Sequence, residues 1–208
     1  MTNILQQGGI MIYPLLFVSV IALTIILERF FKYLLLPQDI PDDFMSEIKE
    51  NIRLNKNDKA LKICEDIRNP IGRILKRGIL HIGGGCEEMY QEMDEAKMHE
   101  FPRYERNLGL LSFIGKISPT MGLLGTVTGM IKTFHYLSLN VEAQQLAEGI
   151  SEALITTAFG LMISIPSLGA YYYFTSKFEK MLTHTDKREI ELTNFVRKSG
   201  VADAKIPD

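Results

Sequence analysis

The sequence has no charged residue before Glu28, and this absence separates its N-terminal part from an ordinary soluble chain. Ile10 to Leu27 is an almost unbroken apolar run. At ~1.5 Å per helical residue, it is long enough to cross most of a hydrocarbon core about 30 Å thick. Two further weakly charged regions follow, from Leu108 to Ile131, interrupted only by Lys116, and from Glu152 to Phe174. We therefore predict three membrane-spanning helices.

The first apolar run also lacks two features of a signal peptide. No basic residue precedes it, and no small-x-small cleavage site follows it, because the next residues are Glu28-Arg-Phe-Phe-Lys. We interpret this run as an uncleaved membrane anchor rather than a signal peptide.

Lysine and arginine are missing from two connections, and this predicts the orientation. Residues 28–107 carry fourteen of the 23 basic residues and the tail after Phe174 carries seven, whereas residues 1–9 and 135–149 carry none. The positive-inside rule then places the N-terminus and the short loop outside, and the long loop and the tail in the cytoplasm. We expect Cys64 and Cys86 to be reduced there and to form no disulfide.

The predicted order along the chain is an outer N-terminus (1–9), helix 1 (10–34), a cytoplasmic helical loop (35–107), helix 2 (108–136), a short outer loop (137–148), helix 3 (149–174) and a cytoplasmic helical tail (175–208). Proline and acidic residues at positions 41–43 indicate the start of a helix. An apolar stripe is predicted at Leu61, Ile63, Cys64 and Ile67, and a second at Ile71, Ile74, Leu75 and Ile79.

The loop contains further signals for helix boundaries. Pro70 is predicted to start a helix that Gly83-Gly84-Gly85 breaks, and a charged helix from Glu87 leads through Pro102 into helix 2. Its charges are interpreted as a solvated face. We predict an all-α membrane protein in which helices 2 and 3 extend into a cytoplasmic helical bundle.

Motifs of common enzymes are absent from the sequence. It contains no HExxH, GxSxG, Cys-x-x-Cys or GxxxxGK[ST], and the triglycine lacks the Lys and Ser/Thr of a phosphate-binding loop. The four histidines have no metal-ligand spacing. We expect no enzymatic activity, no metal and no cofactor.

Small residues recur at helical spacing in the second and third spans. In lipid, such residues let helix backbones approach closely, where apolar burial gives no driving force. On this reading the helix-packing residues are Gly122, Gly125, Gly129, Gly160, Ser164 and Pro166.

One carboxylate and several hydroxyl groups stand beside these small residues. A carboxylate in a membrane span usually faces protein or water, although Glu152 could also lie at the outer boundary, where its cost is small. Threonine hydroxyls can satisfy themselves on their own helix, or can relay protons because they both donate and accept hydrogen bonds. We predict a polar path lined by Thr126, Glu152, Thr156 and Thr157. Its oxygens suit H⁺ or Na⁺, so the ion is open.

At these residues the chain resembles the MotA/TolQ/ExbB proton-channel family. The match is Gly122 to Phe134 (GLLGTVTGMIKTF) and Gly149 to Pro166 (GISEALITTAFGLMISIP), with further similarity at residues 60–79 and at Leu27-Glu-Arg-Phe. Three spans with the large loop after the first resemble ExbB or TolQ, whereas MotA-type stators have four.

The resemblance implies a homopentamer in the bacterial inner membrane, with a periplasmic N-terminus and a cytoplasmic C-terminus. Helices 2 and 3 would surround the membrane helix of an ExbD/TolR-like partner that carries an essential aspartate, and protons would drive work on a TonB- or TolA-like transducer. It also implies that Thr126 and Thr157 line the path and that Glu152 organises its outer vestibule. A TolQ-like role in envelope integrity and cell division, and a passive scaffold for a partner helix, are the alternatives.

Overall fold

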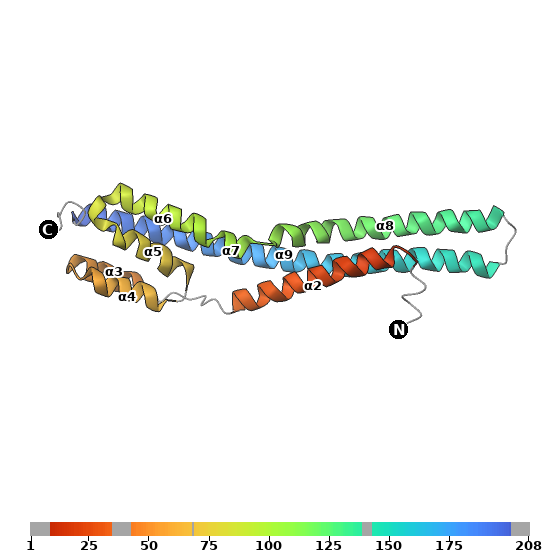
Figure 1. The fold of residues 1–208 in the computed structure, drawn as a ribbon, viewed down its shortest axis with the longest axis horizontal. Helices are drawn as coiled ribbons and strands as arrows, with labels where there is room; N and C mark the ends of the chain where they lie inside the picture. Colours follow the sequence, from red (N-terminus) through yellow and green to blue (C-terminus); the bar gives the residue numbers. More distant parts are fainter. Residues whose placement is uncertain (1–8, 35–42, 68, 139–142, 201–208) are drawn as a thin grey trace. The chain divides into compact units, whose positions relative to one another are not determined.

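The computed structural model describes residues 9–34, 43–67, 69–138 and 143–200, which form helices and short connections (Figure 1). The chain divides into two compact units. The membrane unit comprises Met1–Phe31 and Asn107–Thr175, and the bundle unit comprises Lys32–Arg106 and Ser176–Asp208. Three helices are long and apolar enough to cross a membrane. The predicted all-α fold with three spans is therefore confirmed.

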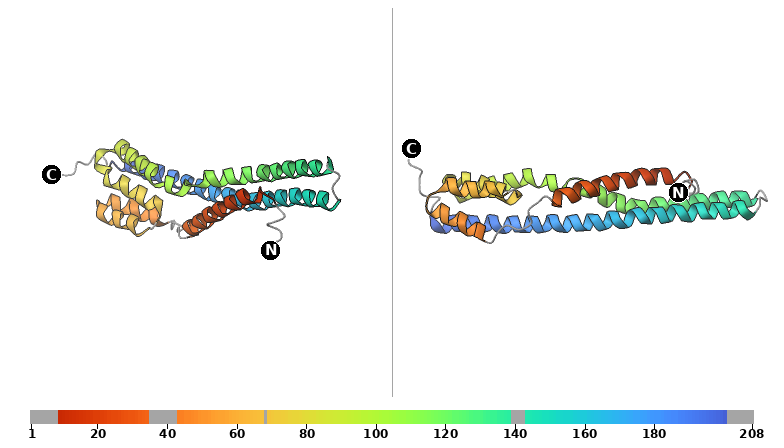
Figure 2. Two further views of the ribbon diagram at one scale, coloured as in Figure 1. Left: turned by 45° about the vertical axis from the view of Figure 1, so that its right-hand side comes forward. Right: turned by 90° about the horizontal axis from the view of Figure 1, so that it is seen from below.

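The membrane unit is built from α2 (Ile12–Leu34), α8 (Leu108–Ser138) and the first part of α9 (Ala143–Ser199). In Figures 1 and 2, α8 runs alongside this part of α9, and α2 lies beside α9 on another side. Large apolar side chains remain exposed on all three helices, among them Phe17, Leu23, Leu123, Val127, Leu154 and Ile165. Lipid or protein partners normally cover apolar surfaces of this extent.

The bundle unit contains α3 (Asp43–Arg53), α4 (Asn57–Asp66), α5 (Pro70–Leu80), the 3-10 helix η1 (Ile82–Gly84), α6 (Cys86–Glu100), α7 (Pro102–Glu105) and the end of α9. Each helix contributes one apolar face to a common core, which includes Phe44, Ile48, Ile52, Ile74, Leu75, Met89, Met93, Leu192 and Val196. Since α9 belongs to both units and is one unbroken helix, the predicted extension of span three as a helix is confirmed.

Local signals explain most helix boundaries. Pro70 begins α5 as predicted, and the Asn69 side chain caps it by accepting a hydrogen bond from the Ile71 N–H at 3.1 Å. The helix that starts at Pro70 already ends at Leu80, before the triglycine; Gly83 and Gly84 belong to η1, and Gly85 separates η1 from α6 with φ 98°, a conformation that L side chains rarely adopt. The charged helix does not run straight into α8, since Asn107 has φ 64° between α7 and α8. The predicted start at residues 41–43 lies outside the described residues except for Asp43.

The predicted apolar stripe of α4 is only partly right. Cys64 is buried together with Ala60, but Leu61, Ile63 and Ile67 are only half-buried. Both cysteines are free, and burial raises the pKa of the Cys64 thiol to about 12. Of the predicted outer segments, residues 1–8 and 139–142 lie outside the described residues.

Candidate functional site

Helices α8 and α9 approach so closely that their backbones touch. A methyl group added at Gly122 would lie 3.0 Å from the Cα of Thr157. One added at Gly160 would lie 2.5 Å from the Ser118 carbonyl oxygen and 3.1 Å from the Gly122 Cα. Only glycine fits at these two positions without moving a backbone, so the glycines set the distance between the helices.

Two more glycines of α8 continue the same contact. Gly125 packs against the side chain of Thr156, and a methyl group at Gly129 would lie 2.8 Å from the Ala153 Cβ. The buried positions of α8 include a line spaced alternately by three and four residues, at positions 108, 111, 115, 118, 122, 125 and 129. This spacing is typical of helices that cross at a small angle. Pro166, predicted with the packing residues, is instead exposed on α9.

A proline in α8 is compensated from α9. Pro119 has no N–H, so it cannot donate the helical hydrogen bond to the carbonyl four residues earlier, at Gly115. The Ser164 hydroxyl of α9 donates to this same oxygen at 2.6 Å, and Ser164 is buried. The interhelical bond therefore satisfies a carbonyl that would otherwise be unpaired in lipid.

The predicted path residues differ in what their hydroxyl groups do. Thr157 donates across the interface to the Gly122 carbonyl at 2.9 Å, and Thr156 donates to the Glu152 carbonyl of its own helix at 2.7 Å. Thr126 donates to the Leu123 carbonyl of its own helix at 2.7 Å. Within the described residues, Thr126 makes no hydrogen bond to Glu152 or Thr157. The structure thus brings Glu152, Thr156 and Thr157 together on α9 and leaves Thr126 at the edge of the contact.

Glu152 forms an ion pair that the sequence analysis missed. Its Oε1 lies 2.8 Å from the Nζ of Lys132, which belongs to α8. A side chain at Gly9, just before α2, would collide with this same oxygen. The signal in the sequence was the position of Lys132 directly after an apolar run, near the end of a helix that must turn back toward Glu152.

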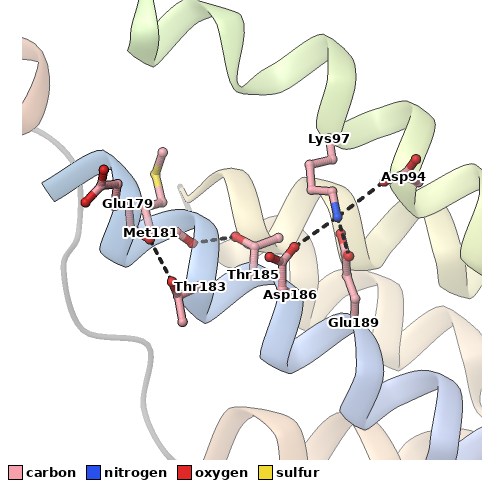
Figure 3. Close-up of polar contacts among 8 residues, drawn as sticks. All are labelled: Asp94, Lys97, Glu179, Met181, Thr183, Thr185, Asp186 and Glu189. Carbon is pink, nitrogen blue, oxygen red and sulfur yellow. Dashed lines mark hydrogen bonds and ion pairs between the residues drawn. The ribbon is translucent and has the colours of Figure 1, made fainter. Parts of the chain in front are cut away.

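A second cluster of charges holds α6 against α9 in the bundle unit (Figure 3). The Lys97 Nζ lies 2.8 Å from Glu189, 3.0 Å from Asp186 and 3.3 Å from Asp94. Glu189 is only 1% exposed, and among the described residues its Oε1 accepts no hydrogen bond. Lys97 was predicted to belong to a solvated face, and this interpretation is wrong.

Burial and hydrogen bonding shift the pKa values of Glu189 and Lys97, the two central groups of this cluster. Burial raises the pKa of Glu189, and the hydrogen bond from Lys97 only partly opposes this. Burial alone would lower the pKa of Lys97, but its hydrogen bonds to Glu189 and Asp186 outweigh that effect and raise it. The ammonium is therefore charged throughout the physiological range. In the part of the chain that the structure describes, no group of three or more His, Cys, Asp or Glu side chains is arranged to hold a metal ion.

Comparison with known proteins agrees with this architecture. A family model described as the MotA/TolQ/ExbB proton channel family matches residues 66–187. The chain is 38% identical over 171 residues to the ExbB-like 1 biopolymer transport protein of Synechocystis, covering 78% of this chain but only 65% of that relative. It is 30% identical over 182 residues to the biopolymer transport protein exbB1 of Vibrio cholerae, covering 78% and 74% of the two chains.

TolQ proteins are also similar over a shorter region. The Tol-Pal system protein TolQ of Pseudomonas aeruginosa is 37% identical over 98 residues, which is 46% of this chain and 42% of that protein. The matched family region includes the whole α8–α9 contact described above. The chain is therefore a multi-pass membrane protein that belongs to the MotA/TolQ/ExbB proton channel family, most like ExbB with TolQ next.

Proposed function

We propose that this chain is an ExbB-like subunit of a motor in the bacterial inner membrane. The motor converts proton motive force into mechanical work on a TonB-type transducer and so energises transport across the outer membrane. The family match and the ExbB-like relatives support this role. We propose no enzymatic activity for this chain.

The observation that carries the proposal is the hydrogen bond of Thr157. Its acceptor, the Gly122 carbonyl, is also the regular α-helical acceptor for the backbone N–H of Thr126, four residues later. The Thr157 hydroxyl can therefore rotate toward water without leaving that carbonyl unpaired. The Ser164 hydroxyl cannot do so, because Pro119 leaves Gly115 without a helical donor. Thr157 thus combines a position at the helix contact with a hydroxyl that is free to relay protons.

The assembly that we propose is a homopentamer around one or more membrane helices of an ExbD/TolR-like partner with a membrane aspartate. The exposed apolar side chains of α8 and α9 provide surfaces for such contacts. The N-terminus would be periplasmic and the C-terminus cytoplasmic, with the span boundaries predicted above. Each proton that crosses gains ~2.3 kcal/mol per 100 mV, so a few protons suffice for mechanical work.

The proposal is tested by Thr157→Val in the native host. We expect energised outer-membrane transport to be lost while the amount of assembled complex stays at the wild-type level. Thr183→Val is the matched control, because the Thr183 hydroxyl is exposed in the bundle unit and donates only to the Glu179 carbonyl of its own helix at 2.9 Å. Normal transport in Thr157→Val cells would contradict the assignment of Thr157 to the path.

Two alternative roles are distinguished by related measurements. A TolQ-like subunit is favoured by the Pseudomonas relative, and its loss would impair envelope integrity and cell division rather than outer-membrane uptake. A passive scaffold would tolerate Thr157→Val and Glu152→Gln. It would fail to assemble when Gly129→Leu places a large side chain against Ala153.

A further inference from the structure

The ion pair between Lys132 and Glu152 joins α8 and α9 near the ends that lead into their connection. Lys132 lies six residues before α8 ends at Ser138, and Glu152 lies nine residues after α9 begins at Ala143. Both side chains keep partial exposure, 46% for Lys132 and 24% for Glu152. The pair therefore lies at the edge of the helix contact and is not sealed inside it.

The carboxylate is enclosed on a further side by the N-terminal part of the chain. Gly9 sits against the same oxygen, Oε1, that receives the Lys132 ammonium, and there is no room for a side chain at Gly9. Its φ of 62° also favours glycine at this position. Three separate parts of the membrane unit thus converge on one carboxylate oxygen.

We propose that Lys132 determines ion specificity at the outer entrance, because its ammonium occupies the cation position on Glu152 and excludes Na⁺. This inference rests on the proposed function and on the expectation, implied by the family resemblance, that Glu152 organises the outer vestibule. It names the residue that would bias the path toward protons.

The charges around the pair support this role. Glu148 lies one helical turn before Glu152 on α9 and is exposed, so two carboxylates share this face of the helix. Without a nearby cation, they would present two negative charges to the solution and attract Na⁺. Lys132 on α8 supplies the positive charge that pairs with Glu152.

The ammonium and a sodium ion compete for the same place. Both carry one positive charge, and the Nζ already lies at hydrogen-bond distance from Oε1. A Na⁺ ion on this oxygen would have to displace the ammonium or bind beside it against like-charge repulsion. Proton transfer does not require an ion to occupy this position, because a proton can be passed along hydrogen bonds between neighbouring oxygen atoms.

Sodium NMR line widths of the purified complex in detergent test the proposal, since line broadening reports weak Na⁺ binding directly. We expect Lys132→Met to gain a Na⁺-dependent broadening several times that of the wild type, and Glu152→Gln in the same chain to remove the gain. Lys132→Arg keeps the positive charge and should bind no more Na⁺ than the wild type. Lys116→Met is the matched control, because Lys116 is an exposed lysine of the same helix without an ion pair among the described residues.

Two results would overturn the proposal. One is a Lys132→Met variant that binds no more Na⁺ than the wild type, and the other is a gain that survives Glu152→Gln. If Lys132→Met does not assemble, Lys132→Gln gives the same comparison with a polar side chain at the membrane surface. Proton uptake, measured on the same preparations in liposomes, distinguishes the proposed function from the role of Lys132. Absence of proton uptake would contradict the proposed function, whereas the Na⁺ measurement tests only whether Lys132 excludes Na⁺.

Discussion

Replacing Ser164 by alanine should destabilise the contact between α8 and α9 by an amount that depends on Pro119. The Ser164 hydroxyl donates to the Gly115 carbonyl at 2.6 Å, and Pro119 cannot supply the helical N–H that would otherwise pair with this oxygen. Ser164→Ala therefore leaves a buried carbonyl without its donor.

The magnitude follows from two limits. An unsatisfied buried acceptor costs about 1–3 kcal/mol, whereas hydrogen bonds between membrane helices average about 0.6 kcal/mol and reach about 1.7 kcal/mol. The Gly115 carbonyl should fall near the upper membrane value, because its ordinary partner is missing. We expect Ser164→Ala to lower the free energy of unfolding by about 1–2 kcal/mol.

The same substitution should cost much less when Pro119 is also replaced. In a Pro119→Ala background, the N–H at position 119 can donate to Gly115, so Ser164→Ala should cost less than about 0.5 kcal/mol. The difference between the two backgrounds is a coupling energy of about 1 kcal/mol, within the range for residues that share a partner.

A double-mutant cycle on the full chain in detergent, followed by equilibrium unfolding, measures this coupling. Ser167→Ala is the matched control, because Ser167 is buried on the same helix but donates to the Ile163 carbonyl of its own helix at 2.7 Å. It should cost the same small amount in both backgrounds. Equal costs of Ser164→Ala with and without Pro119 would refute the reasoning.

Two further predictions concern the bundle charges and the helix contact. Lys97→Met should destabilise the bundle unit by about 2–3 kcal/mol at pH 7, below the 3–5 kcal/mol of a fully buried pair because two of its carboxylates reach solvent. This loss of stability should become smaller as the pH falls through the raised pKa of Glu189, because a neutral carboxyl group needs no counter-charge. Hydrogen exchange of the bundle unit, recorded at several pH values, measures the loss. A loss that does not change with pH would contradict the prediction. Gly160→Ala should destabilise the contact between α8 and α9, because its methyl group would lie 2.5 Å from the Ser118 carbonyl oxygen, whereas the methyl group of Gly169→Ala on the same helix meets open space. Equal thermal unfolding temperatures for the two variants would rule out the backbone contact.

The all-α fold class and the three spans could be predicted because they depend on features local in the sequence. The scarcity of charge over residue runs long enough to cross a bilayer predicted three spans, Pro70 predicted the start of α5, and the triglycine lies in the break between α5 and α6. Each of these signals acts on its own neighbourhood of the chain. None requires knowledge of which helix lies next to it.

The register between neighbouring helices could not be predicted in the same way. Glycines at positions 122, 125 and 129 share one contact because the buried positions of α8 alternate steps of three and four residues, and Thr126 falls beside this line. The ion pairs of Lys132 and Lys97 join residues twenty and 92 positions apart. Such pairs depend on the register between two helices, which no single segment encodes.

We propose that Thr157, which lies at the contact between α8 and α9, is part of the path that protons take across the membrane. Dye-reported proton uptake into liposomes that hold this chain with its one-span partner, under an imposed potential, measures this role of Thr157. We predict uptake by the wild type and by the Ser167→Ala control, and its loss in Thr157→Val at equal amounts of intact complex. Wild-type rates of uptake in Thr157→Val would contradict the account.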